Sequence, residues 1–225
     1  MLQQEGPLRV SDAAERLGVA RSTAHRLLAM LVYRDFAEQD EDRRYVAGPV
    51  LRRPTTPEPA AELRRVALPH LQDLTVRTDE TTNLVVVVGD QARFVASVEC
   101  DRVLRVGDRG GRVLPAHLAS GGRAVLATRH EDELRALYGG AGSPVADVDG
   151  LVRELRRVRR QGFAVNDQRT ETGVTAVGAA VPCDGLAGGI SISMPTARYR
   201  RDRLTEWAGL LAATARAIAR DLGAG

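Results

Sequence analysis

A proline-rich stretch divides this chain of 225 residues soon after its start. Residues 52–59 read Arg-Arg-Pro-Thr-Thr-Pro-Glu-Pro, and such a run of prolines can neither continue a helix nor lie in a central strand. A length of roughly 100–200 residues per domain also allows two units here. We therefore predict a small domain of residues 1–48, a linker of residues 49–62 and a larger domain of residues 63–225.

The basic residues exclude several classes of enzyme, because all 32 of them are arginine and the sequence contains no lysine. A P-loop NTPase and a protein kinase each need a lysine for the nucleotide phosphates, and a Schiff-base enzyme needs a lysine amine. A GC-rich codon composition is the simplest explanation of the bias. No Gly-x-Ser-x-Gly motif surrounds Ser120, and no paired acid and base is evident. We predict no catalytic residues and no enzymatic activity.

The remaining composition favours a soluble cytoplasmic protein. Hydrophobic residues make up 44% and charged residues 27% of the chain, and no apolar run reaches the roughly 18 residues of a membrane span. The first residues lack the basic start and apolar core of a signal peptide. The two cysteines, Cys100 and Cys183, form no Cys-x-x-Cys pair, which indicates a reducing compartment. With four scattered histidines they give no metal-ligand spacing, so we expect neither a metal nor a cofactor.

The N-terminal unit has the pattern helix, turn, helix and hairpin. Ser11 is a candidate N-cap for a first helix to Leu17, and Gly18 suits the left-handed residue that ends it. A second helix is predicted over residues 21–33, because apolar residues recur there at helical spacing, namely Ala24, Leu27, Leu28, Leu31 and Val32. Residues 36–38 and 44–46 are candidate strands, and the polar residues 39–43 between them are predicted to form a hairpin tip.

This arrangement is a winged helix-turn-helix, in which the second helix enters the major groove of DNA. The candidate DNA-binding residues on that helix are Arg21, Ser22, Thr23, His25 and Arg26. Arginine can pair with a guanine edge and hydroxyl groups can hold phosphates, while Arg43 and Arg44 of the hairpin would reach the backbone or the minor groove.

The charge of the N-terminal unit limits this interpretation. Residues 1–48 contain seven arginines and eight acidic residues, a net charge of −1. Affinity for phosphates without sequence specificity is then modest, and a dimer is needed to combine two half-sites. The alternative is a vestigial DNA-binding domain that contacts protein, which would make the chain a metabolite-binding module.

The C-terminal unit alternates helices with hairpins of β-branched residues. Predicted helices cover residues 60–77, 116–128, 148–161 and 205–222, and predicted strands cover residues 83–88, 92–99, 103–106, 174–181 and 188–194. This mixture predicts an α+β fold with a mainly antiparallel sheet flanked by helices. The glycine-rich residues 108–111 lack the strand-to-helix setting of a nucleotide loop, so we predict a mobile turn there.

Several motifs in order along nearly the whole chain resemble the IclR family of bacterial transcriptional regulators. They are residues 14–19 (Ala-Glu-Arg-Leu-Gly-Val), 21–28, 114–127, 162–167 and 190–195 (Ile-Ser-Ile-Ser-Met-Pro). The resemblance implies a winged helix-turn-helix, a linker helix and a GAF- or profilin-like effector domain. It also implies a repressor that binds a double-stranded DNA operator as a homodimer or a dimer of dimers, modulated by a small-molecule metabolite. Family members have a full helix before the first motif, whereas here only residues 2–5 precede Gly6-Pro7, so either the first helix is shortened or the start of the chain is mis-assigned.

The resemblance also places an effector pocket. The residues at its positions are Ser120, Gly121, Gly122, Asn166, Asp167, Ala176, Ser191 and Ser193. Ser191 and Ser193 are two residues apart, which puts both hydroxyls on one face of a strand, and the start of the helix at Ser120 offers backbone N–H groups to an anion.

Two of these positions differ from the pattern of members that bind small oxo-acids. Asn166 stands at the position of an acid and Ala176 at that of a cysteine, which disfavours glyoxylate or pyruvate and favours a larger or aromatic ligand. Two plainer interpretations stay open: the serines face solvent on an edge strand, or Ser120 only caps its helix.

Overall fold

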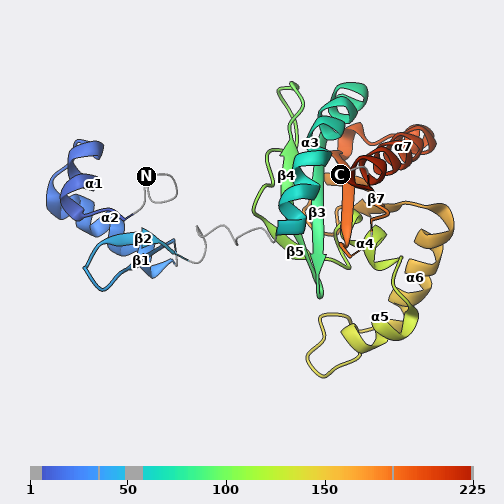
Figure 1. The fold of residues 1–225 in the computed structure, drawn as a ribbon, viewed down its shortest axis with the longest axis horizontal. Helices are drawn as coiled ribbons and strands as arrows, with labels where there is room; N and C mark the ends of the chain where they lie inside the picture. Colours follow the sequence, from blue (N-terminus) through green and yellow to red (C-terminus); the bar gives the residue numbers. More distant parts are fainter. Residues whose placement is uncertain (1–6, 35, 49–57, 184, 224–225) are drawn as a thin grey trace. The chain divides into compact units, whose positions relative to one another are not determined.

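The computed structural model describes residues 7–34, 36–48, 58–183 and 185–223. The chain divides into two compact units between Thr56 and Pro57 (Figure 1). Most of the predicted linker, residues 49–57, lies outside the described residues. The remaining residues of the predicted linker, from Glu58, begin a long helix, α3 (Glu58–Thr78). The shortened helix predicted at residues 2–5 also lies outside the described residues.

Two short helices form the first part of the N-terminal unit, α1 (Val10–Leu17) and α2 (Arg21–Tyr33). Gly18 ends α1 in the left-handed conformation with φ 62°, as predicted. Its N–H donates to Glu15 O and that of Val19 to Ala14 O, which are the two bonds of a Schellman motif. The prediction that Ser11 is the N-cap is wrong. The helix starts earlier because the Asp12 carboxylate accepts the backbone N–H of Arg9 at 3.1 Å.

A hairpin completes this unit, with strands β1 (Ala37–Gln39) and β2 (Tyr45–Ala47) each one residue later than predicted. Leu8 joins it as a β-bridge to Tyr45. The core consists of Leu8, Ala13, Ala14, Ala24, Leu28, Ala37 and Tyr45. Of the five apolar residues predicted to line one face of α2, only Ala24 and Leu28 are buried, since so small a unit encloses little interior.

A six-stranded antiparallel sheet forms the centre of the C-terminal unit, in the order β5-β4-β3-β8-β7-β6 (Figure 1). The bounds are β3 (Thr81–Val88), β4 (Gln91–Val98), β5 (Val113–Pro115), β6 (Ala164–Asp167), β7 (Val174–Ala180) and β8 (Gly188–Pro195). Neighbouring strands pair antiparallel throughout. The predicted α+β class with an antiparallel sheet is confirmed.

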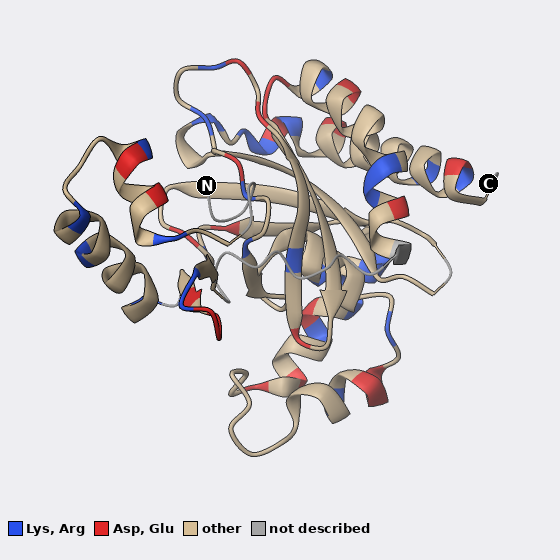
Figure 2. Ribbon diagram, turned by 60° about the vertical axis from the view of Figure 1, so that its left-hand side comes forward, with Lys and Arg blue, Asp and Glu red and all other residues tan. Residues whose placement is uncertain are grey.

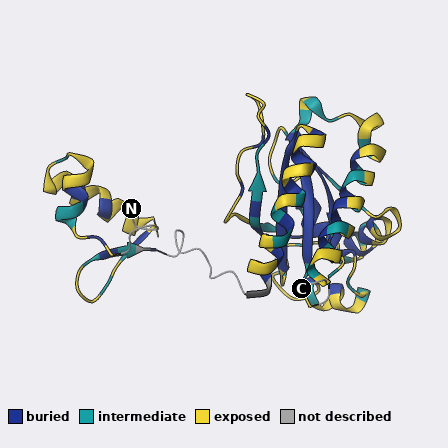
Figure 3. Ribbon diagram, turned by 45° about the horizontal axis from the view of Figure 1, so that its top comes forward, coloured by how far each residue is buried: buried dark blue, intermediate teal, exposed yellow. Residues whose placement is uncertain are grey.

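Helices cover both faces of this sheet, whose strands are largely buried (Figure 3). Because successive side chains of a strand point to opposite faces, the core is divided in two. One face meets α3 and α7 (Leu204–Gly223), and it receives Ile190, Ile192 and Met194 of β8. The other face meets α4 (Ser120–Leu126), with α6 (Val148–Gln161) and α5 (Glu131–Tyr138) packed beyond it. Short 3-10 helices at Thr196–Arg198 and Arg201–Arg203 lead into α7. In the described part of the chain, no helix is both long and apolar enough to cross a membrane.

Three differences from the predicted elements affect the site. Residues 103–106 form no strand, and Val103 is fully exposed, because Arg102 and Arg105 hold this loop to Asp79 and Glu99. The helix predicted from residue 116 starts only at Ser120, since the preceding residues form a turn whose first N–H, that of Ala116, donates to Asp90 O. The sequence analysis missed α5, and β5 and β6 have only three and four residues, too few for a periodic pattern.

Candidate functional site

The predicted DNA-binding face of α2 is open in this structure. All five of its candidate residues are exposed, namely Arg21, Ser22, Thr23, His25 and Arg26. Ala24 and Leu28 fix the opposite side of the helix in the core. Ala20 at the N-cap offers no side-chain acceptor, so the first N–H groups of α2 remain available to a phosphate.

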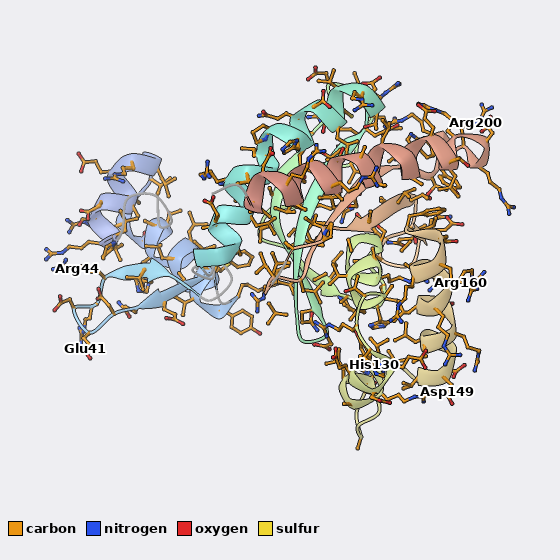
Figure 4. All side chains as sticks on the ribbon, turned by 45° about the vertical axis from the view of Figure 1, so that its right-hand side comes forward. Glu41, Arg44, His130, Asp149, Arg160 and Arg200 are labelled. Atoms are coloured by element: carbon orange, nitrogen blue, oxygen red, sulfur yellow. The ribbon has the colours of Figure 1, made fainter. Side chains whose placement is uncertain are left out.

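The hairpin tip carries the other two candidates among three acidic residues. Arg43 is exposed and has a positive φ of 57°, a conformation held by the bond from its own N–H to Asp40 O. Arg44 is half-buried, and its Nη2 atom lies 3.6 Å from a carboxylate oxygen of Asp42. Glu41 and Arg44 extend from the same tip (Figure 4), and acidic and basic residues are interspersed over both units (Figure 2). Arg43 is therefore the better placed of the two to reach a phosphate.

A narrow cavity lies on the α4 face of the sheet. Six of the eight predicted effector residues line it, namely Ser120, Gly121, Asn166, Ala176, Ser191 and Ser193. The other lining residues are Val85, Phe94, Arg109, Leu114, Ala119, Thr170 and Val174. Its free space is about 340 Å³ with the open mouth included, but the cavity is narrow throughout. It has room for little more than water in this conformation, so a larger ligand requires the walls to move.

The two remaining predicted residues do not line the cavity. Asp167 follows Asn166 on β6 and faces the other way, where it is exposed and accepts a hydrogen bond from Thr175. Gly122 packs against the turn before α4, because a Cβ at this position would lie 2.6 Å from Ala116 O. Its lack of a side chain serves the packing of the helix.

Glycines bring the start of α4 onto the sheet and so place Ser120 over the cavity. A Cβ on Gly178 of β7 would lie 2.5 Å from the backbone nitrogen of Gly121, and one on Gly189 of β8 would lie 2.7 Å from its carbonyl oxygen. Only glycine permits this approach of helix to strand. Among the described residues, no group of three His, Cys, Asp or Glu could hold a metal.

The cavity floor is a buried polar network centred on Asn83, a residue that the sequence did not single out. Its Nδ2 atom lies 3.0 Å from Ser193 Oγ and 3.5 Å from Ser191 Oγ, and its Oδ1 atom accepts the hydroxyl of Ser97 at 2.8 Å. The serines lie on β8 between β3 and β7, and each is only 4% exposed, so the solvent-facing edge-strand interpretation is wrong. Because Asn83 donates to the serine oxygens, their hydroxyl hydrogens remain available to an acceptor in the cavity.

Asn166 uses its amide to shape the turn beside the cavity. Its Nδ2 atom donates to Thr170 Oγ1 at 2.7 Å, and its Oδ1 atom accepts the backbone N–H of Arg169 at 2.8 Å. Both bonds hold the turn of residues 168–173 that joins β6 to β7. An asparagine here thus supports the wall of the cavity.

Arg109 is the only charged residue in the cavity lining, and the sequence did not single out its side chain. It comes from the glycine-rich residues 108–111, which form a turn bonded to β4: Gly111 N–H donates to Phe94 O. The side chain is 7% exposed and donates to Glu171 Oε2 at 2.5 Å. That hydrogen bond, more than any other influence, holds the pKa of Glu171 below its usual value. Arg109 therefore lines the cavity and is paired with an ionised carboxylate.

Together these units define a class of protein: a winged helix-turn-helix DNA-binding unit combined with an α+β unit that contains a polar cavity. Residues 59–220 match the C-terminal domain of the bacterial transcriptional regulator IclR, and residues 1–41 match the IclR helix-turn-helix domain. The chain belongs to the IclR family of bacterial transcriptional regulators. It is a DNA-binding regulator and not an enzyme.

Relatives and solved structures agree with this assignment. The chain is 28% identical over 228 residues to the HTH-type transcriptional repressor AllR of Escherichia coli K12, covering 97% of this chain and 84% of AllR. It superposes on Thermotoga maritima IclR with a TM-score of 0.67 and 26% identity, covering 99% and 94% of the two chains. An IclR homolog from Microbacterium hydrocarbonoxydans complexed with 4-hydroxybenzoate shares the fold, with a TM-score of 0.67, 24% identity and coverage of 97% and 92%.

Proposed function

We propose that the cavity on the α4 face is the site at which a small-molecule effector controls this regulator. The observation that carries the proposal is convergence: Ser120, Asn166 and the pair Ser191 and Ser193 come from separate elements and line one cavity. The buried hydroxyl donors on the floor fix the orientation of a ligand, and the apolar walls of Val85, Phe94 and Leu114 take its body.

We further propose that α2 reads an operator in the major groove. The exposed arginines Arg21 and Arg26 are near its N-terminal end, where recognition helices contact base edges. The net charge of −1 of residues 1–48 favours two half-sites bound together, so the active form is a homodimer or a dimer of dimers. Such a regulator acts in the cytoplasm, where bacterial DNA lies. The name of AllR supports repression as the mode of action.

The effector acts by shifting a population between DNA-competent and DNA-incompetent arrangements. Such a shift requires that the ligand bind the two arrangements with different affinity. The narrow cavity of this conformation has little room for a ligand, so binding moves its walls, and we propose that this movement favours one of the two arrangements. The 4-hydroxybenzoate bound by the M. hydrocarbonoxydans homolog makes an aromatic acid a reasonable first probe.

A mobility-shift titration with the DNA upstream of this protein's own gene tests the proposal. We expect retention that persists against an excess of unrelated DNA and weakens steeply with salt, because each phosphate contact contributes about −0.9 to the log–log slope. Retention without sequence preference, or none at any salt, favours the rival in which the DNA-binding unit is vestigial and contacts protein. Metabolites that raise the melting temperature of the full chain are then added to the same titration.

A further inference from the structure

A second pocket of the C-terminal unit lies beside α6 and shares no lining residue with the cavity on the α4 face. We call it the α6 pocket. Its walls include α6, which runs between the labelled Asp149 and Arg160 in Figure 4, the edge strand β6 and the first residue of α7. Its free space is about 650 Å³ with the open mouth included, which is enough for a small molecule.

Three arginines and one carboxylate line the α6 pocket, and they come from separate elements. Arg123 belongs to α4, Glu154 and Arg157 belong to α6, and Arg169 belongs to the turn that joins β6 to β7. The other lining residues are uncharged. With three positive charges and one negative charge, the lining has a formal net charge of +2.

Glu154 is an acceptor that two of these arginines share. Arg123 Nη2 donates to Glu154 Oε2 at 2.7 Å, and the two terminal nitrogens of Arg169 donate to the same carboxylate at 3.0 and 3.2 Å. Elsewhere in this unit, Arg198 has the carboxylate of Glu80 to itself, with two bonds of 2.6 Å. The α6 pocket therefore holds less negative charge than its guanidinium groups can pair with.

Two of the three guanidinium groups have donors without an acceptor. The Arg123 side chain is 7% exposed, and its buried Nε atom has no hydrogen-bond partner among the described residues. Arg157 is exposed, and within the described part of the chain it forms neither a side-chain hydrogen bond nor an ion pair. Burial, followed by the charges of Arg169 and Arg157, lowers the pKa of Arg123 despite its bond to Glu154. An anion in the pocket would reduce this repulsion and supply acceptors.

The rest of the lining indicates what kind of anion fits. Phe163, Val165 and Leu204 line the pocket and are each half-buried, and apolar walls with a few converging charges are typical of a site for an organic molecule. A singly charged group leaves part of the +2 charge unpaired. A phosphate monoester carries about −1.5 to −2 charges at pH 7, and its three terminal oxygens match the forks of arginine.

We propose that the α6 pocket binds a phosphate monoester of a small organic molecule and is a second ligand site, separate from the cavity on the α4 face. The phosphate group contacts the guanidinium groups of Arg123, Arg157 and Arg169. The organic part lies against Phe163 and Leu204.

Two substitutions on one helix test this site. Arg157→Gln removes a charge from the pocket and leaves the fold intact, because the exposed side chain gives up no hydrogen bond or ion pair with the described residues. It should lower affinity for a phosphate monoester ~10-fold, the effect of losing one charge-assisted hydrogen bond. Arg160→Gln is the matched control, since Arg160 is an exposed residue of α6 that does not line the pocket.

Isothermal titration calorimetry of the full chain with phenyl phosphate measures the affinity, at constant ionic strength because salt screens charges. Inorganic phosphate and dimethyl phosphate are titrated beside it. We expect phenyl phosphate to bind more tightly than either, since inorganic phosphate lacks an apolar body and dimethyl phosphate lacks the second charge. The double variant Ser191→Ala with Ser193→Ala should bind phenyl phosphate like wild type, because these serines line only the cavity on the α4 face.

Three results would overturn the inference: no binding of phenyl phosphate by wild type, equal affinities in Arg157→Gln and Arg160→Gln, or dimethyl phosphate binding as tightly as phenyl phosphate. Binding that is lost in the double serine variant and kept in Arg157→Gln would also overturn it, because the ester would then occupy the cavity on the α4 face. All four results leave the proposed function standing. That function fails separately, through absence of specific operator binding by the wild type.

Discussion

The Nδ2 atom of Asn83 donates to the hydroxyl oxygen of Ser193 across the β3–β8 pair, at 3.0 Å and out of contact with solvent. The register sets this relationship, since Asn83 lies directly opposite Ser191 and one face of the sheet receives all three side chains. One amide thus orients two hydroxyls towards the cavity, while Ser97 satisfies its carbonyl oxygen. The floor of the proposed effector site is a network that is preorganised by strand pairing.

Removing the centre of this network should destabilise the fold. Asn83→Ala leaves the half-buried hydroxyl of Ser97 without its acceptor and takes the donor from both cavity serines, so we expect a loss of ~1–3 kcal/mol in the free energy of unfolding. Urea titration of the C-terminal unit's transition measures it. Ser97→Ala removes one bond of the three and should cost less. An equal loss in both variants would contradict the central position of Asn83.

Ser191 and Ser193 should affect the response to the effector and not the affinity for DNA. We expect the double variant Ser191→Ala with Ser193→Ala to weaken the response of operator binding to the effector, because two donors disappear from the cavity. Operator affinity without ligand should be unchanged. The measurement is a mobility-shift titration with and without a stabilising ligand. A full response in the double variant would place the ligand elsewhere.

On the DNA side, Arg26→Ala should abolish specific retention while the protein stays folded. A bidentate arginine–guanine contact contributes about 1–3 kcal/mol of discrimination, and each of two half-sites in a dimer would lose it. Arg34→Ala is the matched control, since Arg34 is exposed just beyond the other end of α2. Fluorescence anisotropy with operator and scrambled DNA gives both affinities. Equal operator affinities for the two variants would count against α2 as the recognition helix.

Local sequence patterns predicted the helices in which apolar residues repeat regularly. The bounds of α2 and α6 agree with the prediction, because each helix has a clear apolar repeat, and α6 ends at a left-handed Gly162. The prediction of a strand at residues 103–106 was wrong, because apolar composition alone does not show whether a neighbouring strand is available for pairing. The sequence did not identify Asn83 and Arg109 as site residues for a related reason. Their partners lie 110 and 62 residues away along the chain, so only strand register and loop closure reveal their roles.

The surroundings of two glycines predict opposite outcomes for their substitution by alanine. A Cβ on Gly178 would meet backbone atoms of Ser120 and Gly121 at 2.5 Å, so Gly178→Ala should cost ~1–3 kcal/mol and shift α4 from the cavity. Gly209 lies in α7 with open space around its Cα, so Gly209→Ala should stabilise by ~0.5–1 kcal/mol. Denaturant midpoints of both variants test this pair. Similar effects of the two changes would mean that the contact is not rigid.

Acid should weaken the C-terminal unit partly through Glu154. Hydrogen bonds from Arg169, followed by the charges of Arg123 and Arg169, lower the pKa of Glu154 from its ordinary 4.5. The Arg123 side chain, 7% exposed, bonds Glu154 at 2.7 Å and Val165 O at 2.8 Å. Because the folded pKa of Glu154 lies below the unfolded one, its contribution to stability is present above about pH 4.5 and is lost as the pH falls through the lowered value.

Glu154→Gln removes the negative charge between Arg123 and Arg169 and replaces one of the two acceptor oxygens by an NH2 donor. We expect a loss of ~1–3 kcal/mol at pH 7, discounted from a fully buried pair because a third of the Glu154 side chain is exposed. The difference from wild type should shrink as the pH is lowered from 6 towards 3, since wild type then loses the same interaction. Urea unfolding at several pH values measures how the stability of wild type and of Glu154→Gln changes with pH. Glu133→Gln is the control, because Glu133 is an exposed residue of α5. A difference that stays constant with pH would show that ionisation of Glu154 does not support the fold.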